Sequence, residues 1–336
     1  MSPKPVILDV DPGHDDAVAL MLACGHPDLD LLAVTTVAGN VPIEKTTRNT
    51  LRVLSFVGCT HVPVGVGASE PLERPLHTAE DIHGESGLDG AEEIPDAGFE
   101  PDERVAVALI ADILRASPEP VTLVPVGPLT NIATFLREHP DLKEKVAHIS
   151  LMGGSMGHGN TTPAAEFNIY VDPEAAREVF ESGLPITMSG LDITHQAGAG
   201  PDERERLRAT GRVGGVVAGF LDFFAATYES VFGFDAPPLH DPVAVAAVLE
   251  PGLLKTRPMR VDIECESDLT RGDRLRLLRC DRQGAECRGR RRSRPRRFLQ
   301  AAVRNAVRRS AFSSTGRAQR ADHESVESCE SRNISW

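Results

Sequence analysis

Short apolar runs alternate with segments of helical periodicity from residue 5 to residue 264, and this alternation is the strongest constraint on the fold. The apolar runs are rich in Val, Ile and Leu, as buried parallel strands are, and the segments between them repeat apolar residues every three to four positions. We expect strands at residues 5–10, 29–37, 62–66, 121–126, 146–152, 185–189 and 259–264. We expect helices at residues 15–24, 42–57, 103–115, 129–138, 173–181, 202–210, 214–228 and 242–250. The pattern predicts a single α/β domain with a Rossmann-like core, in which helices cover both faces of a doubly wound, mostly parallel sheet.

The charge of the chain divides sharply near residue 271. Residues 1–270 carry a net charge of −24, whereas residues 271–336 carry +11, with 18 arginines and no lysine. We therefore expect a domain at residues 1–272 and an atypical Arg-rich tail at residues 273–336, either disordered or translated out of frame. A basic arm for nucleic acid is the alternative for the tail. The acidic body disfavours nucleic acid as a partner of the domain and suits a neutral substrate or a bound cation.

The sequence shows no pattern typical of a signal peptide, a membrane span or a pair of metal-binding cysteines. The apolar run at residues 6–10 is too short for a signal peptide, and there is no run of about 18 uncharged apolar residues that would span a membrane. The six cysteines have no CxxC spacing. We expect a cytoplasmic protein with reduced thiols and no membrane partner.

Polar clusters follow five of the predicted strands, in the segments 9–16, 35–40, 126–131, 152–168 and 192–195. The carboxyl ends of parallel strands meet at one edge of a sheet, so these segments should converge on one cleft. The first holds four aspartates in the run Asp-Val-Asp-Pro-Gly-His-Asp-Asp at residues 9–16. Neighbouring carboxylates repel one another unless a cation lies between them. Their oxygen atoms favour a hard ion, Ca²⁺ or Mg²⁺, although a single aspartate there could simply cap a helix.

A DxD pair after a first strand also occurs in haloacid-dehalogenase-type phosphatases, which use Mg²⁺. Their motif has Thr or Val two residues after the second aspartate, where this chain has Gly13. They also need a lysine at a later strand end, and none of the five lysines has such a place. The phosphatase hypothesis is therefore the weaker one.

The chain resembles the inosine-uridine preferring nucleoside hydrolase family over about residues 5–272. The first motif is Asp9-Val-Asp-Pro-Gly-His-Asp-Asp16, and the others follow in order: Val37-Ala-Gly-Asn40, His83-Gly84 with Gly87-Leu88, Val126-Gly-Pro-Leu-Thr-Asn131, Met152-Gly-Gly154, Glu166-Phe-Asn168 with Asp172-Pro173, and His240-Asp241. Each motif is weak alone, but the ordered set is specific. The resemblance implies the family's fold and hydrolysis of the N-glycosidic bond of ribonucleosides by a calcium-activated water.

The resemblance also implies roles for individual residues. Asp11, Asp16, Asp241 and the carbonyl of Val126 would bind Ca²⁺, with Asp9 behind them. Ribose would be held by Asp15, Asn40, Asn160, Glu166 and Asn168 in a pocket lined by Met152, and His83 and His240 would lie near the base. Relatives are generally homodimers or homotetramers.

Elementary chemistry assigns these groups three tasks. Asp11 would take the proton of the attacking water, polar groups would orient the sugar as its charge develops, and His240 would protonate the leaving base. Ribonucleosides are the implied small-molecule substrates, but the sequence does not decide between purine and pyrimidine bases.

Several of these residues also have purely structural interpretations. Asn40 could be a turn residue, Asn131 and Asp172 could be helix caps, and Tyr228 is expected to be a core residue. The long Gly- and Pro-rich stretch at residues 67–103 could be a mobile lid. A sugar-binding protein with impaired catalysis is the main alternative function, because the sequence after Gly272 departs from the family.

Overall fold

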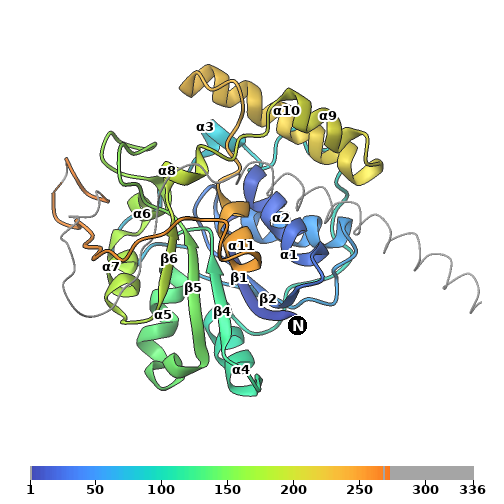
Figure 1. The fold of residues 1–336 in the computed structure, drawn as a ribbon. Helices are drawn as coiled ribbons and strands as arrows, with labels where there is room; N and C mark the ends of the chain where they lie inside the picture. Colours follow the sequence, from blue (N-terminus) through green and yellow to red (C-terminus); the bar gives the residue numbers. More distant parts are fainter. Residues whose placement is uncertain (1, 268, 273–336) are drawn as a thin grey trace, which may run out of the picture.

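The computed structural model describes residues 2–267 and 269–272 of the 336-residue chain. Its centre is a six-stranded sheet in the order β3-β2-β1-β4-β5-β6, and every neighbouring pair is parallel (Figure 1). The strands are β1 (Lys4–Val10), β2 (Leu29–Thr36), β3 (Val64–Val66), β4 (Val121–Pro125), β5 (Val146–Met152) and β6 (Ile186–Ser189). The predicted parallel sheet is confirmed.

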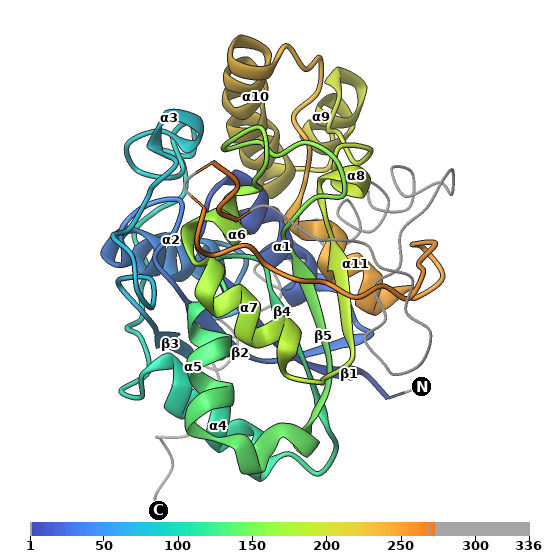
Figure 2. The same cartoon turned by 90° about the vertical axis from the view of Figure 1, so that its left-hand side faces the viewer.

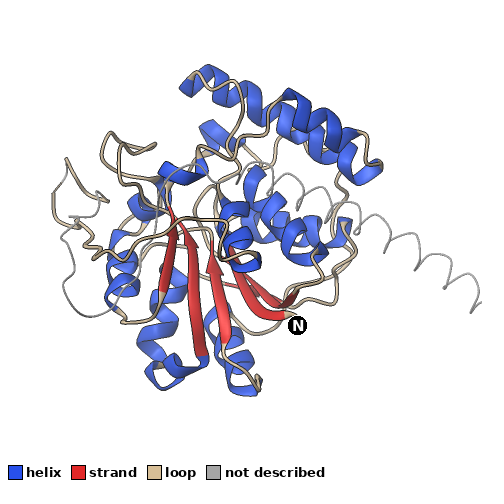
Figure 3. Cartoon of the chain, viewed as in Figure 1, coloured by secondary structure: helices blue, strands red, loops and turns tan. Residues whose placement is uncertain are grey.

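Helices lie on both faces of this sheet (Figure 3). One apolar core joins the sheet to α1 (His14–Gly25), α2 (Ile43–Phe56), α10 (Arg212–Phe232) and α11 (Asp241–Leu249). A second core joins it to α4 (Ala106–Ala116), α5 (Thr130–Glu138) and α7 (Pro173–Glu181). In β1, Val6 and Leu8 belong to the first core and Ile7 to the second, because successive side chains of a strand point to opposite faces.

The order of the strands places a crevice at the end of β1. This strand lies between β2 and β4, so the chain after β1 is built out to one side of the sheet and later returns to the other. At such a switch point the connections diverge, and ligands of open α/β sheets bind there. The short helices α3 (Glu80–His83), α6 (Phe167–Val171) and α8 (Leu191–Thr194), which the sequence did not predict, lie in the connections that follow β3, β5 and β6.

Helices α9 (Pro201–Arg208) and α10 form a pair above the carboxyl ends of the strands (Figure 2). Among the described helices α10 is long and apolar enough to cross a membrane by length and composition. Phe220, Phe224 and Tyr228 recur on it every four residues and are buried within the domain. The buried face of α10 therefore belongs to the core, while Phe223 and Val231 on the same helix are exposed.

The predicted helices and the first six predicted strands are present, with ends that differ by a few residues. The strand predicted at residues 259–264 is wrong: in the described part of the chain this segment pairs with no strand. Met259 and Val261 are buried against the α4–α5–α7 core, while Arg260 is exposed and pairs with Asp262 over 2.7 Å. The alternation of apolar and polar residues comes from packing of an extended segment, not from a hydrogen-bonded ladder.

The tail predicted at residues 273–336 lies outside the described residues. Residues 67–103 form loops apart from the short helix α3. Their mobility stays a prediction, as does the domain boundary at residue 272.

Candidate active site

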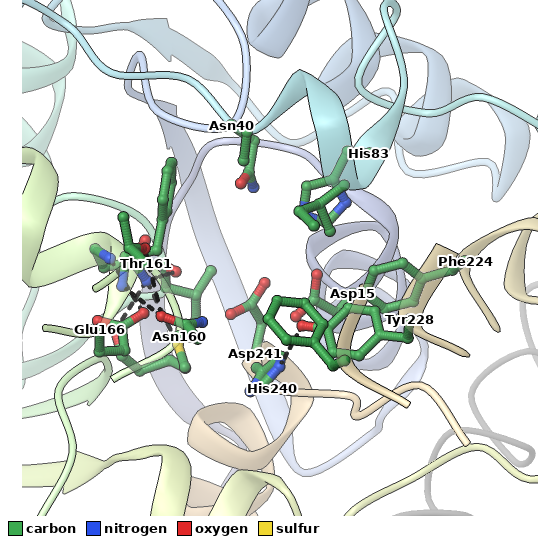
Figure 4. A pocket seen from close by; sticks show the side chains of 17 residues that line it. Asp15, Asn40, His83, Asn160, Thr161, Glu166, Phe224, Tyr228, His240 and Asp241 are labelled. Carbon is green, nitrogen blue, oxygen red and sulfur yellow. Dashed lines mark hydrogen bonds between the residues drawn. The ribbon is translucent and has the colours of Figure 1, made fainter. Parts of the chain in front are cut away.

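A pocket opens at the carboxyl ends of the strands, where ligands of open α/β sheets bind, and its space up to and including the open solvent at its mouth is about 540 Å³. Its lining comes from eight separate parts of the chain: Asp15, Asn40, Ala79, Ile82, His83, Val126, Met152, Asn160, Thr161, Glu166, Phe167, Asn168, Phe224, Tyr228, Phe232, His240 and Asp241. Figure 4 shows acidic side chains at its floor, Asn160 and Glu166 on one side, and His83, Phe224 and Tyr228 on the other. The pocket is thus polar on one side and aromatic on the other.

Three buried carboxylates form a cluster at the floor. Asp15 and Asp16 come from the first turn of α1, and Asp241 comes from the first turn of α11. Each offers one oxygen, and the three oxygens lie within 4.8 Å of one another. The helices α1 and α11 pack closely, which is why residues so distant in sequence meet here.

Asp11 lies beside this cluster in a tightly built setting. Its Oδ2 accepts the peptide N–H of Asn40 over 2.8 Å, and its backbone N–H donates to Oδ1 of Asp16 over 3.1 Å. A Cβ added to Gly39 would lie 2.1 Å from Oδ2 of Asp11, and one added to Gly127 would lie 2.4 Å from Oδ1. Only glycine at these two positions lets the backbone approach the carboxylate so closely. Oδ1 of Asp11 is buried and has no hydrogen-bond partner among the described residues.

Burial makes every carboxylate of this group hard to ionise without a cation. Burial, followed by the charge of Asp16, raises the pKa of Asp15 to about 8. Burial raises the pKa of Asp16 to about 6. For Asp11 and Asp241, burial and then the neighbouring carboxylates raise the pKa well above its ordinary value. Groups arranged in this way favour a bound positive charge.

Asp9 lies behind the cluster, as predicted. Its Oδ1 accepts hydrogen bonds from Thr35 and from Nδ2 of Asn131, and burial raises its pKa to about 7. Asn131 also donates to the carbonyl of Thr36 and accepts the peptide N–H of Ala68. Asn131 is therefore not a helix cap, because it connects three strand ends. Asp172 does cap α7, accepting the peptide N–H of Ala175 over 3.0 Å.

The polar side of the pocket is built around α6. Glu166 caps this helix, accepting the peptide N–H groups of Asn168 and Ile169, and it also accepts the peptide N–H of Gly154 over 2.8 Å. Asn168 donates from Nδ2 to the carbonyl of Val126 over 2.7 Å and to that of Met152 over 3.2 Å. Oδ1 of Asn160 accepts the peptide N–H of Phe167 over 3.0 Å. These bonds fix the polar groups before any ligand arrives.

The aromatic side contains two buried histidines. His240 contacts Oγ1 of Thr194 through Nδ1 over 2.7 Å and the hydroxyl of Tyr228 through Nε2 over 2.9 Å. Burial, followed by the charge of His195, lowers the pKa of His240 to about 3. His83 stacks on Phe224 with ring centroids 5.3 Å apart.

The predicted site residues are brought together here. Those that line the pocket are Asp15, Asn40, His83, Val126, Met152, Asn160, Glu166, Asn168, His240 and Asp241. Asp16 does not line it but lies next to Asp15 and Asp241, and Asp11 is hydrogen-bonded to Asp16. Tyr228 was expected in the core. It is buried, but it also lines the pocket and contacts His240. The apolar lining residues Ala79, Ile82, Phe167, Phe224 and Phe232 were missed, because apolar residues on a helix or loop carry no sequence signal that separates a pocket wall from a core. Thr161 was missed as well.

Comparison with known proteins agrees with this geometry. Residues 6–312 match the family model described as inosine-uridine preferring nucleoside hydrolase. Over 270 residues the chain is 51% identical to the pyrimidine-specific ribonucleoside hydrolase RihA of Citrobacter koseri, covering 80% of this chain and 86% of that protein. It is 50% identical over the same length to the RihA of Escherichia coli O139:H28.

Solved structures show the same fold. A purine-preferring ribonucleoside hydrolase from Gardnerella vaginalis superposes with a TM-score of 0.85 at 32% identity, covering 92% of this chain and 100% of that one. A plant nucleoside hydrolase, PpNRh1, superposes with a TM-score of 0.83 at 31% identity, covering 91% of this chain and 99% of that one.

The parallel sheet, the acidic floor and the pocket between polar and aromatic walls define an N-glycosyl hydrolase. The chain belongs to the inosine-uridine preferring nucleoside hydrolase family, and its reaction is hydrolysis of the N-glycosidic bond of ribonucleosides to ribose and free base.

Proposed function

We propose that this chain is a calcium-dependent ribonucleoside hydrolase that prefers pyrimidine nucleosides. The base preference is supported by the two relatives at 50–51% identity, which are named pyrimidine-specific. The solved relative named purine-preferring is more distant, at 32% identity. The observation that carries the proposal is the buried group of Asp15, Asp16 and Asp241, with oxygens within 4.8 Å of one another, at the floor of a pocket that has one polar and one aromatic side.

The residues of the floor suit a hard divalent cation. Asp11, Asp16 and Asp241 would hold it together with the carbonyl of Val126, and the fit is supported by the unpartnered Oδ1 of Asp11. An all-oxygen donor set favours Ca²⁺ over Zn²⁺. The bound ion would supply a lowered pKa for the attacking water and an anchor for sugar hydroxyls.

Asp11 is the proposed general base. Oδ2 is held by the peptide N–H of Asn40, while Oδ1 has two lone pairs and no protein partner among the described residues, so Oδ1 could contact the ion and also accept the proton of the attacking water. The backbones around Gly39 and Gly127 prevent the carboxylate from turning away. The nucleophile would thus be generated at one fixed atom.

The ribose would lie between the acidic floor and the α6 wall. Asp15 is aimed into the pocket from the floor, and Asn40, Asn160, Glu166 and Asn168 offer amide and carboxylate groups around it (Figure 4). Hydrogen bonds to the backbone hold these polar side chains in place, so they can stabilise the charge that develops on the sugar without first reorganising. Met152 would pack against the sugar ring.

His240 is proposed to assist departure of the base through Tyr228. Both ring nitrogens of His240 already have partners, and the hydroxyl of Tyr228 lies 2.9 Å from Nε2. A neutral His240 would donate its Nε2–H to the Tyr228 oxygen, so that the Tyr228 hydroxyl donates a hydrogen bond to the departing base, and the base takes its proton from solvent. His83 would contact the base from the opposite end of the aromatic wall.

Two further features belong to this proposal. We expect a homodimer or homotetramer in the cytoplasm, and light scattering of the purified protein would measure the assembly.

Ribose release from uridine, cytidine and inosine tests the function. We expect release with Ca²⁺ present, fastest from the pyrimidine nucleosides, and loss of release after chelation with EGTA. A folded protein that releases ribose fastest from inosine would contradict the base preference.

A further inference from the structure

Asn49 is a buried polar residue of α2 that the proposed chemistry does not use. Its side chain is buried, with the residue 2% exposed, and it does not line the pocket. The Nδ2 atom carries two N–H donors. It donates to the carbonyl of Ser86 over 2.9 Å and to the carbonyl of Pro12 over 3.3 Å. Each of these carbonyls is 37 positions from Asn49 along the sequence, on opposite sides of it, so one amide joins two distant segments.

The Pro12 end of this connection belongs to the acidic floor. Pro12 is buried in the turn that follows Asp11, and within the part of the chain that the structure describes, Asn49 makes the one hydrogen bond to its carbonyl. The next peptide N–H, that of Gly13, donates to Oδ2 of Asp16 over 3.0 Å. A shift of this turn would therefore move Asp11 and Asp16, which are two proposed ligands of the ion.

The Ser86 end belongs to the segment that brings His83 to the pocket. Helix α3 ends at His83, and the following turn closes with a hydrogen bond from the peptide N–H of Gly87 to the carbonyl of Gly84 over 3.0 Å. Gly87 has a φ of 81°, and a Cβ added to it would lie 3.1 Å from Nδ2 of Asn49. Glycine therefore permits both the turn and its close approach to α2.

Two neighbouring side chains of α2 also contact this region, but only at its edge. Lys45 donates to the carbonyl of Glu85, and the exposed Arg48 pairs with Asp96 over 2.7 Å. Neither makes a hydrogen bond to residues 9–16 in the described chain. Asn49 differs from them because it is buried and reaches both segments.

We propose that Asn49 is a positioning residue that holds the ion-binding turn and the His83 segment in their relative places, so that ion binding and base recognition depend on the same amide. Without the amide, the buried carbonyl of Pro12 would lose its partner, and the turn would shift to find another. The two segments would then relax independently. This role rests on the proposed function, because it requires an ion at the floor and a base beside His83.

Asn49→Leu removes both donors with little change in volume and adds no charge near the ion. Arg48→Leu is the matched control, because it cuts an exposed contact of the same helix that does not reach Pro12. Calorimetric titration with calcium chloride should give a Kd about five- to tenfold higher in Asn49→Leu than in the wild type, the scale of one hydrogen bond, and an unchanged Kd in Arg48→Leu. A Kd of Asn49→Leu within about twofold of wild type would overturn the proposal.

Hydrogen exchange measures the connection between the two segments without any substrate. In the wild type, calcium should slow exchange in peptides that cover residues 11–16 and also in peptides that cover residues 84–89. In Asn49→Leu at saturating calcium the first effect should persist, while the second should be at least halved. An undiminished effect of calcium on residues 84–89 in this variant would contradict the connection through Asn49.

Kinetics at saturating calcium separate the two ends. The ion then restores the turn, so kcat of Asn49→Leu for uridine should be within about threefold of wild type, while the released His83 segment should raise KM about five- to tenfold. A lower melting temperature with unchanged calcium Kd and unchanged KM would show a merely structural role and overturn the proposal. If Asn49→Leu does not fold, the same three measurements apply to Asn49→Ser, whose side chain is too short to reach both carbonyls. If calcium binds but no nucleoside is hydrolysed, the proposed function fails, while the titration and the exchange still decide the role of Asn49.

Discussion

The peptide N–H of Asn40 donates to Oδ2 of Asp11 over 2.8 Å, while Oδ1 of the same carboxylate has no partner among the described residues. A buried carboxylate oxygen without a partner is costly, because it has lost its water and gained nothing. This penalty for burial is offset when a cation binds the oxygen or a water molecule donates a hydrogen bond to it. This one oxygen therefore connects the ion and the chemistry of the proposed site.

Replacing Asp11 by Asn should abolish most of the turnover. The amide keeps the size of the side chain but cannot take a proton, so we expect kcat for uridine to fall by roughly 10²–10⁴-fold. The exposed control Asp141→Asn should leave kcat unchanged. A kcat of Asp11→Asn within about threefold of wild type would show that another group is the base.

Gly127→Ala should disturb the same carboxylate from the backbone side. The added methyl would lie 2.4 Å from Oδ1 of Asp11, so either the side chain or the loop after β4 must shift. We expect a stability loss of about 1–3 kcal/mol in urea denaturation and at least a tenfold loss in kcat/KM. Gly98→Ala is the matched control, because nothing lies within 4 Å of its added Cβ. Full activity in Gly127→Ala would mean that the position of Asp11 is not critical.

Tyr228→Phe isolates the hydroxyl that contacts His240. The ring and its packing remain, and only the 2.9 Å contact to Nε2 is lost. We expect kcat for uridine to fall about 10- to 100-fold with KM within about threefold, since the hydrogen bond from Tyr228 to the departing base would strengthen in the transition state. The other tyrosine of the chain is Tyr170, which lies outside the pocket lining, so Tyr170→Phe is the control. An unchanged kcat in Tyr228→Phe would leave His240 without the proposed route.

Calcium should stabilise the folded domain in addition to supporting the reaction. The five buried aspartates at positions 9, 11, 15, 16 and 241 repel one another when ionised, and a ligand that binds only the folded state adds about 2.7 kcal/mol at a concentration of 100 Kd. For a domain of this size we expect the melting temperature to rise by roughly 5 °C or more over that in EGTA. Differential scanning calorimetry measures this shift. Asp241→Asn should reduce it, and an undiminished shift in that variant would place the ion elsewhere.

The sequence predicted the sheet and most of the pocket because strand periodicity and strand-end polar clusters are local signals that parallel topology brings together. Asp241 is far from Asp16 along the chain, yet both open a helix next to the same crevice. The false strand at residues 259–264 shows the limit of periodicity, since packing of Met259 and Val261 produces the same alternation as a ladder.

Other parts of the site could not be predicted because they depend on tertiary contacts. Tyr228 follows Phe220 and Phe224 at a spacing of four, which indicates a buried helix face and says nothing about a neighbouring imidazole. The contact between His14 and His83 joins α1 to the loop of α3 across 69 positions of sequence, and no local pattern reports it.

The most direct test of the central claim is ribose release from uridine by the purified wild-type chain, measured with Ca²⁺, after EGTA, and again after Ca²⁺ is restored. The account predicts release that stops on chelation and returns with Ca²⁺, and its near absence in Asp11→Asn under all three conditions. Release that continues at the full rate after thorough chelation would contradict the calcium site and the role of Asp11 beside it.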